Sequence, residues 1–314
     1  MIDDLIERTE KGDAKAAEEL LNINYNEVFE LFEASSSLRD KKKGRRIRIV
    51  GHQGDVSPCS LNPPCRFCSL SSSLGAYKSE RIAVPMDTII KNSIIMVNRG
   101  ARALLYGGGI SPISGKIAVD IAEAIKRVTD IEVYFNVGPV LENDVNTLKR
   151  LGVRRFVISL ETLDRKSFQD ARPGDSYDKK IEFIKLLGEK GMGISVILMN
   201  GVGGSLIRSI TSLMEFKGIS GIRFSTFKPV PGTPWEKREP ASVFETLKSC
   251  AVARLLFNSI ELDLAAGVSD DLRSLSFMAG CGNEVIGMIG GRDGVRDWTH
   301  RIRADAKIMG FSVE

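Results

Sequence analysis

Histidine is scarce in this sequence, whose 314 residues include only His52 and His300. That scarcity argues against a zinc site built from imidazoles and against a Ser–His–Asp hydrolase. No apolar run approaches the roughly 20 residues that span a bilayer. The acidic, amphipathic start, residues 1–13, lacks the basic and apolar segments of a signal peptide. We therefore expect a cytoplasmic protein without a membrane partner.

The chain also lacks a strong charge of one sign. Its formal net charge is +4, with 43% hydrophobic and 27% charged residues, which is ordinary for a globular protein and does not call for a nucleic-acid partner. One basic run, residues 41–46, is short and has no aromatic neighbours. We expect a solvated turn there, leading into a strand, rather than a contact to phosphate or nucleic acid.

Cysteine is rare outside one segment. The chain has five cysteines, which are Cys59, Cys65, Cys68, Cys250 and Cys281. Three of them fall within ten positions, in a loop rich in Gly, Pro and Ser, which in a reducing compartment indicates metal binding. Thiolates select iron–sulfur clusters or zinc. A structural zinc site needs a fourth protein ligand, whereas a [4Fe–4S] cluster on three thiolates leaves one iron open.

Short apolar runs alternate with helical stretches after residue 44. The expected buried strands are 47–51, 103–107, 133–137, 156–160, 194–199, 222–227, 260–264 and 285–289. Helical patterns lie between them, for example at 120–128, 144–151, 177–190 and 240–258, and Gly152, Gly191, Gly218 and Gly310 are placed to end helices. Eight such units predict an α/β fold, a (β/α)8 TIM-type barrel over residues 45–314. Residues 1–44 form an N-terminal helical extension, read as two short helices.

Active sites of such barrels lie at the carboxyl ends of the strands, and the cysteine loop follows the first one. Three cysteines at that place resemble the radical S-adenosylmethionine (radical SAM) superfamily. Its usual spacing is C-x3-C-x2-C, and this chain has C-x5-C-x2-C, with Phe67 before the last cysteine. The resemblance implies that Cys59, Cys65 and Cys68 hold a [4Fe–4S] cluster. It also implies that S-adenosylmethionine binds the open iron and is cleaved to a 5′-deoxyadenosyl radical.

The resemblance extends over about residues 45–295 and implies a set of cofactor contacts. They are Phe67 near the adenine, Gly107, Gly108 and Gly109 at the amino group, Ser159 and Glu161 at the ribose or methionine part, Lys180 at the carboxylate, and Gly201 and Val202 at the adenine. The family usually has Arg where this chain has Lys180, and Lys179 is the neighbouring option. Pro229–Pro234 and Ala279–Asn283 resemble segments of the biotin synthase branch.

Within that branch, the chain departs from biotin synthase, which holds a second cluster on cysteines inside its barrel. Here Asn136 follows the third strand and no cysteine follows the fifth. The cysteine spacing resembles the Hmd co-occurring family (HmdB/HcgA type), which implies radical carbon–carbon chemistry that builds the pyridinol part of the [Fe]-hydrogenase cofactor. A methylornithine-synthase-like mutase or another radical lyase is the alternative. A non-catalytic iron–sulfur scaffold is a third reading, which the cofactor motifs disfavour.

Polar residues at the strand ends are candidates to contact the substrate or to take part in catalysis. They are Tyr106, Asn136, Arg223, Thr226 and Cys281. Arg223 would suit a small acidic substrate, because a cation inside a barrel attracts a carboxylate. His52, close to the cysteine loop, could shield the cluster or move a proton. The resemblance also implies an electron donor such as ferredoxin or flavodoxin.

Overall fold

All eight strands expected from the sequence are present in the computed structural model, which describes residues 2–68, 83–265 and 274–314. Their bounds are β1 Arg46–Gln53, β2 Ala103–Gly107, β3 Glu132–Asn136, β4 Arg155–Glu161, β5 Gly193–Asn200, β6 Ile219–Thr226, β7 Glu261–Leu264 and β8 Glu284–Gly291. Each lies within three residues of its expected bounds. Continuous apolar runs predicted them well because both faces of every strand are covered.

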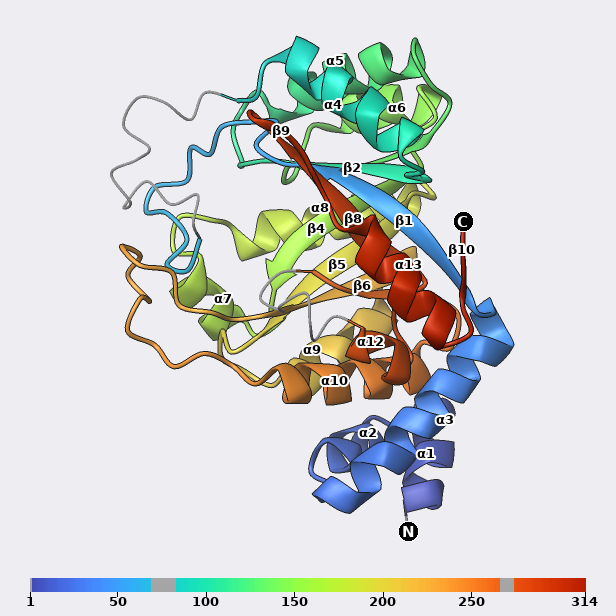
Figure 1. Ribbon diagram of the computed structural model, residues 1–314. Helices are drawn as coiled ribbons and strands as arrows, with labels where there is room; N and C mark the ends of the chain where they lie inside the picture. Colours follow the sequence, from blue (N-terminus) through green and yellow to red (C-terminus); the bar gives the residue numbers. More distant parts are fainter. Residues whose placement is uncertain (1, 69–82, 266–273) are drawn as a thin grey trace.

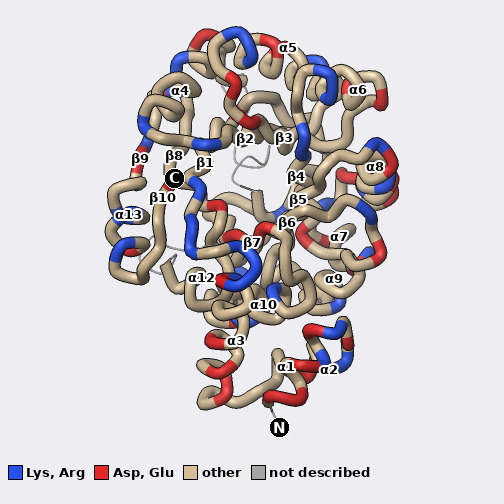
Figure 2. Tube along the Cα trace, turned by 90° about the vertical axis from the view of Figure 1, so that its right-hand side faces the viewer, with Lys and Arg blue, Asp and Glu red and all other residues tan. Residues whose placement is uncertain are grey.

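The strands form one parallel sheet in the order β7-β6-β5-β4-β3-β2-β1-β8. Viewed along its axis, the sheet curves into a ring (Figure 2). No ladder joins β7 to β8 among the described residues, but the Gly282 amide donates to the Leu262 carbonyl at 2.9 Å just before β8. Two strands that the sequence did not indicate extend the sheet: β9, Gly294–Asp297, pairs antiparallel with β8, and β10, Ser312–Val313, pairs with β1. The fold is therefore the expected α/β barrel type.

Helices cover the outside of the sheet (Figure 1). They are α4 Met86–Asn98, α5 Ser114–Lys126, α6 Glu142–Arg150, α7 Arg165–Ala171, α8 Tyr177–Glu189, α9 Leu206–Ser212, α10 Val243–Leu256, α12 Leu275–Met278 and α13 Thr299–Ile308. The four helices that the sequence indicated correspond to α5, α6, α8 and α10. Gly152, Gly191, Gly218 and Gly310 all have positive φ at helix ends or just beyond. No described helix is long and apolar enough to cross a membrane.

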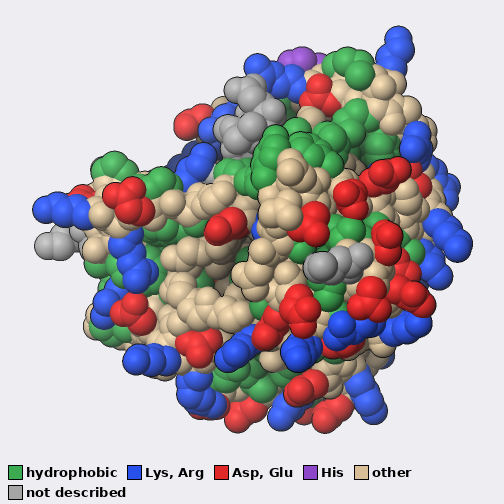
Figure 3. Space-filling model, turned by 90° about the horizontal axis from the view of Figure 1, so that it is seen from below, with side chains coloured by type: hydrophobic (Ala, Val, Ile, Leu, Met, Phe, Trp, Pro, Cys, Tyr) green, Lys and Arg blue, Asp and Glu red, His purple; other side chains and the backbone are tan. Residues whose placement is uncertain are grey.

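The N-terminal segment contains three helices rather than the expected two. They are α1 Ile2–Glu10, α2 Ala14–Leu21 and α3 Tyr25–Lys43. In Figure 1, α1 and α2 lie below α10, and α3 rises from them along the right-hand side to the start of β1. A capping box between Asn24 and Glu27 starts α3. The lysines expected in a turn instead form its last turn, where cations are favoured by the helix dipole, and Gly44 ends it at φ 72°. The face seen from below mixes acidic and basic side chains (Figure 3).

Alternate residues of the strands point into the barrel and form layers. At the amino-terminal end, Glu284 accepts hydrogen bonds from Tyr134 at 2.8 Å, Arg155 at 2.7 Å and Arg48 at 3.1 Å. Above this polar floor lies a small apolar cluster that includes Val50, Ala103, Leu105, Val157 and Ile286. The amino-terminal end is thus filled by side chains, and the carboxyl ends of the strands carry the open pocket.

Candidate functional site

The loop after β1 that carries Cys59 runs along the loop after β2. The Val56 amide donates to the Gly107 carbonyl at 3.1 Å, and the Gly109 amide donates to the Ser57 carbonyl at 2.9 Å. The Ser57 hydroxyl adds a bond to the Gly109 carbonyl at 2.7 Å. A Cβ on Gly109 would lie 2.4 Å from Cys59. The glycines therefore let the backbone next to Cys59 lie directly against the end of β2.

The other end of the cysteine loop is held by different elements. The Arg66 amide donates to the Ala171 carbonyl of α7 at 3.0 Å. The Trp235 amide, in the loop after β6, donates to the Arg66 carbonyl at 3.1 Å, and the Trp235 ring lies 5.9 Å from that of Phe67. Cys65 and Cys68 thus sit on a turn fixed to α7 and to the loop after β6.

The two ends of the loop enclose a cavity of about 350 Å³ at the mouth of the barrel. All three cysteines line it, and so do these residues expected at the cofactor or substrate: Phe67, Gly107, Gly108, Gly109, Asn136, Ser159, Glu161 and Lys180. The Asn136 amide donates to the Ser159 hydroxyl at 3.1 Å, which joins the ends of β3 and β4 on the cavity wall. The structure therefore brings most of the expected residues together in one place.

Four buried charges form one network on a wall of this cavity. Arg172 donates to Glu161 at 2.9 Å and pairs with Asp175 at 2.7 Å, and Lys180 pairs with Asp175 at 3.3 Å. Burial, reinforced by the Arg172 cation, lowers the pKa of Lys180 to about 8, although Asp175 opposes the shift. Burial raises the pKa of Asp175, but Lys180 and Arg172 outweigh it and leave that pKa below its usual value.

Glu161 is held in an unusual conformation at the end of β4. Its φ is 67°, in a region that residues with a Cβ seldom occupy, and the pairing of β4 with β5 is irregular at this point. Burial raises the pKa of its carboxyl, against the effect of Arg172. The oxygen Oε2 is buried and no described residue gives it a hydrogen bond. A buried acceptor in a strained backbone is typical of a ligand site.

His52 occupies space that Gly107 leaves free. A Cβ on Gly107 would lie 2.6 Å from the imidazole Nε2, so the ring lies directly on the glycine. Burial, with a contribution from Arg223, lowers the pKa of His52 to about 4, which makes the imidazole neutral at pH 7. His52 therefore presents an uncharged ring to the cavity that it lines.

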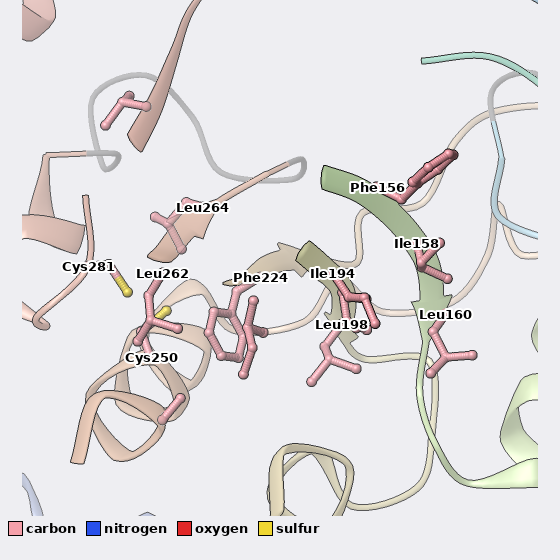
Figure 4. Packing of buried hydrophobic residues seen from close by; sticks show 14 of the residues in the cluster. Phe156, Ile158, Leu160, Ile194, Leu198, Phe224, Cys250, Leu262, Leu264 and Cys281 are labelled. Atoms are coloured by element: carbon pink, nitrogen blue, oxygen red, sulfur yellow. The ribbon is translucent and has the colours of Figure 1, made fainter. Parts of the chain in front are cut away.

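Three substrate candidates point away from the cavity. The Tyr106 hydroxyl lies 2.8 Å from that of Ser93 in α4, and the Thr226 hydroxyl lies 2.9 Å from that of Thr246 in α10. Cys281 is fully buried with a hydrogen bond to Cys250, and the two sulfurs face each other (Figure 4). The structure therefore does not place these three side chains on the cavity wall, because position at a strand end does not fix which face a side chain takes.

Arg223 lies deeper in the barrel than the cavity. Its side chain is 3% exposed and faces Asp263 and Glu284, each at 3.6 Å. No described residue accepts a hydrogen bond from either terminal guanidinium nitrogen. The cation therefore adds positive potential below His52 without being hydrogen-bonded at its tip.

Gly201 and Val202 lie beside the cavity rather than on its wall. Val202 belongs to a small apolar cluster with Ala171, Phe227 and Trp235, against which Phe67 packs. Trp235, and the pairing of Arg172 with Asp175, are parts of the site that sequence reasoning did not assign. For Trp235, the signal in the sequence is its position directly after the Gly232–Pro234 turn.

The cavity fits a [4Fe–4S] cluster and S-adenosylmethionine. Three thiols line one cavity, Glu161 offers a buried acceptor without a donor, and Lys180 offers a cation. Among the described residues no three His, Cys, Asp or Glu side chains converge as ligands of a single metal ion. Thiols that share a cavity without converging on one point suit a cube of four irons better than one zinc ion.

Comparisons with known proteins agree with this geometry. The model of the radical SAM superfamily matches residues 58–216. An uncharacterized protein of Methanocaldococcus jannaschii is 28% identical over 246 residues, which cover 76% of this chain and 64% of that relative. Biotin synthase of Heliobacterium modesticaldum is 25% identical over 291 residues, 88% of this chain and 86% of the relative.

Two solved structures share the fold over the whole chain. Methylornithine synthase has a TM-score of 0.85 at 20% identity and covers 99% of this chain and 97% of its own. HydG, a maturase of the [FeFe]-hydrogenase, has a TM-score of 0.86 at 17% identity, covering 100% of this chain and 76% of its own. At these identities the likeness concerns the fold alone.

Proposed function

The chain belongs to the radical SAM superfamily of [4Fe–4S] enzymes, and we propose that Cys59, Cys65 and Cys68 bind the cluster while the cavity beside them binds S-adenosylmethionine. The observation that carries this proposal is the meeting of three thiols and a buried ion network in one cavity. When bound, the cluster supplies one electron that cleaves the cofactor to a 5′-deoxyadenosyl radical. An electron donor such as ferredoxin or flavodoxin would reduce it.

The chain's own residues bind and orient the cofactor. Lys180, charged below its pKa of about 8, pairs with the cofactor carboxylate while Asp175 keeps it in place. Glu161 Oε2 accepts a hydrogen bond from a ribose hydroxyl, and Arg172 holds the other carboxylate oxygen. The backbone at Gly107–Gly109 faces the amino group. Phe67 and the neighbouring Val202 provide the apolar surface for the adenine.

We further propose that the substrate is a small acid. Arg223 places a buried cation below His52. It pairs with Asp263 and Glu284 at 3.6 Å, its terminal nitrogens donate no hydrogen bond to a described residue, and it helps to keep the imidazole neutral. A carboxylate entering the cavity above His52 would be attracted by this potential and could accept a hydrogen bond from the neutral ring. Asn136 and Ser159, on the same cavity wall, would contact the polar part of such a molecule.

For the reaction, we propose radical carbon–carbon chemistry that builds the pyridinol part of the [Fe]-hydrogenase cofactor. The C-x5-C-x2-C spacing supports this assignment. Sulfur insertion is not proposed, because a second cluster would need further thiols at the cavity. Cys250 and Cys281 are buried against each other outside it.

The first experiment is anaerobic. The protein is reconstituted with iron and sulfide, S-adenosylmethionine and dithionite are added, and 5′-deoxyadenosine is measured. We expect it from the wild type and not from a Cys59→Ser, Cys65→Ser, Cys68→Ser variant. A Cys250→Ala, Cys281→Ala variant is the matched control and should keep its iron content and activity. Equal production by the triple variant would disprove the assignment of the ligands.

The substrate class is tested with a panel of amino and carboxylic acids, each paired with its methyl ester. An acid that increases deoxyadenosine formation, when its ester does not, supports the proposal. Arg223→Gln should abolish that increase and Arg223→Lys should retain part of it, while Arg127→Gln, at an exposed arginine after α5, serves as the control. Mass spectrometry for a pyridinol product then tests the reaction, and a rearranged amino acid as the only product would favour the mutase instead.

A further inference from the structure

Trp235 joins the cysteine loop to the barrel through an aromatic cluster. It is 5% exposed and packs with Ala171, Val202 and Phe227 in an apolar cluster separate from the main core. Its ring lies 5.7 Å from that of Phe227 and 5.9 Å from that of Phe67. The Arg238 guanidinium covers it at 3.7 Å, as a cation does on an indole face. The indole is therefore enclosed on several sides, with Phe67 as its contact to the loop.

Phe67 lies between two of the three cysteines, so its position determines theirs. The turn closes on itself through the Cys68 amide and the Cys65 carbonyl at 3.4 Å. Beyond the turn, the backbone bonds of Arg66 lead to Ala171 and to Trp235 itself. Ala171 and Trp235 also share the apolar cluster. The partners of both backbone bonds thus pack together in one cluster around the indole ring, and Arg66 also pairs with Asp170 of α7 at 2.8 Å.

Cys59 is attached independently of this cluster. The Val56 amide donates to the Gly107 carbonyl, Ser57 pairs with Gly109, and the Ser60 amide donates to the Ile110 carbonyl at 2.8 Å. None of these bonds involves α7 or the loop after β6. Removal of the indole should therefore loosen Cys65 and Cys68 and leave Cys59 where it is.

We infer that Trp235 is a positioning residue for the cluster: through Phe67 it sets where the Cys65 and Cys68 thiolates lie. The inference rests on the proposed ligand set. Groups that orient metal ligands without touching the metal commonly change metal affinity by about 10- to 100-fold when removed. Phenylalanine at position 235 keeps an aromatic ring and the backbone amide, so it should restore much of what alanine loses.

The first test uses the protein without its cluster and measures amide hydrogen exchange. In Trp235→Ala, amides of residues 65–68 should exchange faster than in the wild type, while amides of residues 56–60 should be unchanged. Trp235→Phe should resemble the wild type. Unchanged exchange at residues 65–68 would overturn the inference, and so would an equal acceleration at residues 56–60 and 65–68. Neither result depends on cluster assembly.

The second test uses the reconstituted holoprotein. Trp235→Ala should lose iron to a chelator about tenfold faster than the wild type and should show an altered electron paramagnetic resonance signal of the reduced cluster. Trp235→Phe and the distant Trp298→Phe should behave like the wild type. An unaltered signal with an unaltered rate of iron loss would refute the inference. If the wild type itself assembled no cluster, the proposed function would fail instead, and the exchange experiment would still decide the role of Trp235.

A third measurement covers the case in which the alanine variant does not fold. The chain has two tryptophans, so Trp298→Phe leaves Trp235 as the only indole. Trp235→Phe likewise leaves Trp298 as the only indole. Cluster assembly should quench the fluorescence of Trp235 in the first variant more strongly than that of Trp298 in the second. Equal quenching of the two would contradict a place for Trp235 beside the cluster.

Discussion

The carbonyl oxygen of Pro63 lies 2.1 Å from the position that a Cβ of residue 174 would take, so only glycine fits at position 174. Pro63 belongs to the stretch between Cys59 and Cys65, which is two residues longer than the spacing usual in the superfamily. Gly174 belongs to the turn that connects Arg172 to Asp175. The long part of the cysteine loop therefore rests directly on the segment that holds the ion network.

Gly174→Ala should displace this part of the loop. Overpacking of this kind costs about 1–3 kcal/mol, so we expect a lower melting temperature and lower iron content after reconstitution. Gly291→Ala is the matched control, because nothing lies within 4 Å of a Cβ at that position. Calorimetry and iron analysis compare the two variants. Equal melting temperatures and iron contents would mean that the cysteine loop moves aside without cost.

Glu161→Gln should weaken binding of S-adenosylmethionine. The change preserves the shape of the side chain but removes the charge that Arg172 holds at 2.9 Å, and it turns one oxygen into an amide donor. Hydrogen bonds to charged groups contribute about 1.5–3 kcal/mol, so the dissociation constant should rise roughly 10- to 100-fold. Equilibrium dialysis of the reconstituted protein measures it. An unchanged constant would place the ribose elsewhere.

Lys180→Met should stabilise the cofactor-free protein and weaken the binding of S-adenosylmethionine. The pKa of Lys180 falls to about 8, below its usual 10.5, so the charged form is disfavoured in the folded state. That cost, about 3 kcal/mol, is present below pH 8 and disappears as the pH rises toward 10.5. Denaturant unfolding at pH 7 and pH 10 should show the stability advantage of the variant shrinking. A variant less stable than the wild type at pH 7 would contradict this account.

His52 should remain neutral to low pH. Its pKa of about 4 lies below the ordinary value of 6.5, so the folded state loses stability as the pH falls from 6.5 toward 4, by up to about 3 kcal/mol. The His52 ring resonances in nuclear magnetic resonance spectra give the titration, and they are assigned as those absent from His52→Gln. His52→Gln should remove this part of the acid sensitivity. Titration of the His52 ring near pH 6.5 would show that His52 is solvated.

Sequence patterns predicted the strands and the cysteine loop well but did not predict side-chain direction. Asn136 and Ser159 face the cavity and Tyr106 faces α4, although all three stand near the ends of strands. A shift of one residue along a strand moves a side chain from the barrel interior to the helix side. A continuous apolar run does not show which residues point inward. The N-terminal segment has three helices rather than two because residues 11–13 separate α1 from α2, and the Asp13 side chain caps α2 by accepting from the Lys15 and Ala16 amides.

Gly174 and Trp235 also depend on contacts between segments far apart in the chain. Their neighbours, Pro63 and Phe67, precede them by more than 100 positions. Local periodicity carries no information on such pairs. The part of the site that a single sequence can indicate is therefore the set of chemically reactive groups, while the residues that fix their geometry emerge only from the fold.

Separate attachment of the two ends of the cysteine loop has a consequence for recognising such proteins. What the cluster requires is a fixed span between the edge of β2 and α7, and the number of residues that cross this span is free to vary. A loop shortened to three residues between Cys59 and Cys65 would have to follow a straighter path between the same two attachments. The number of residues between the cysteines therefore reflects how directly the loop runs, and not the distance between its two attachments.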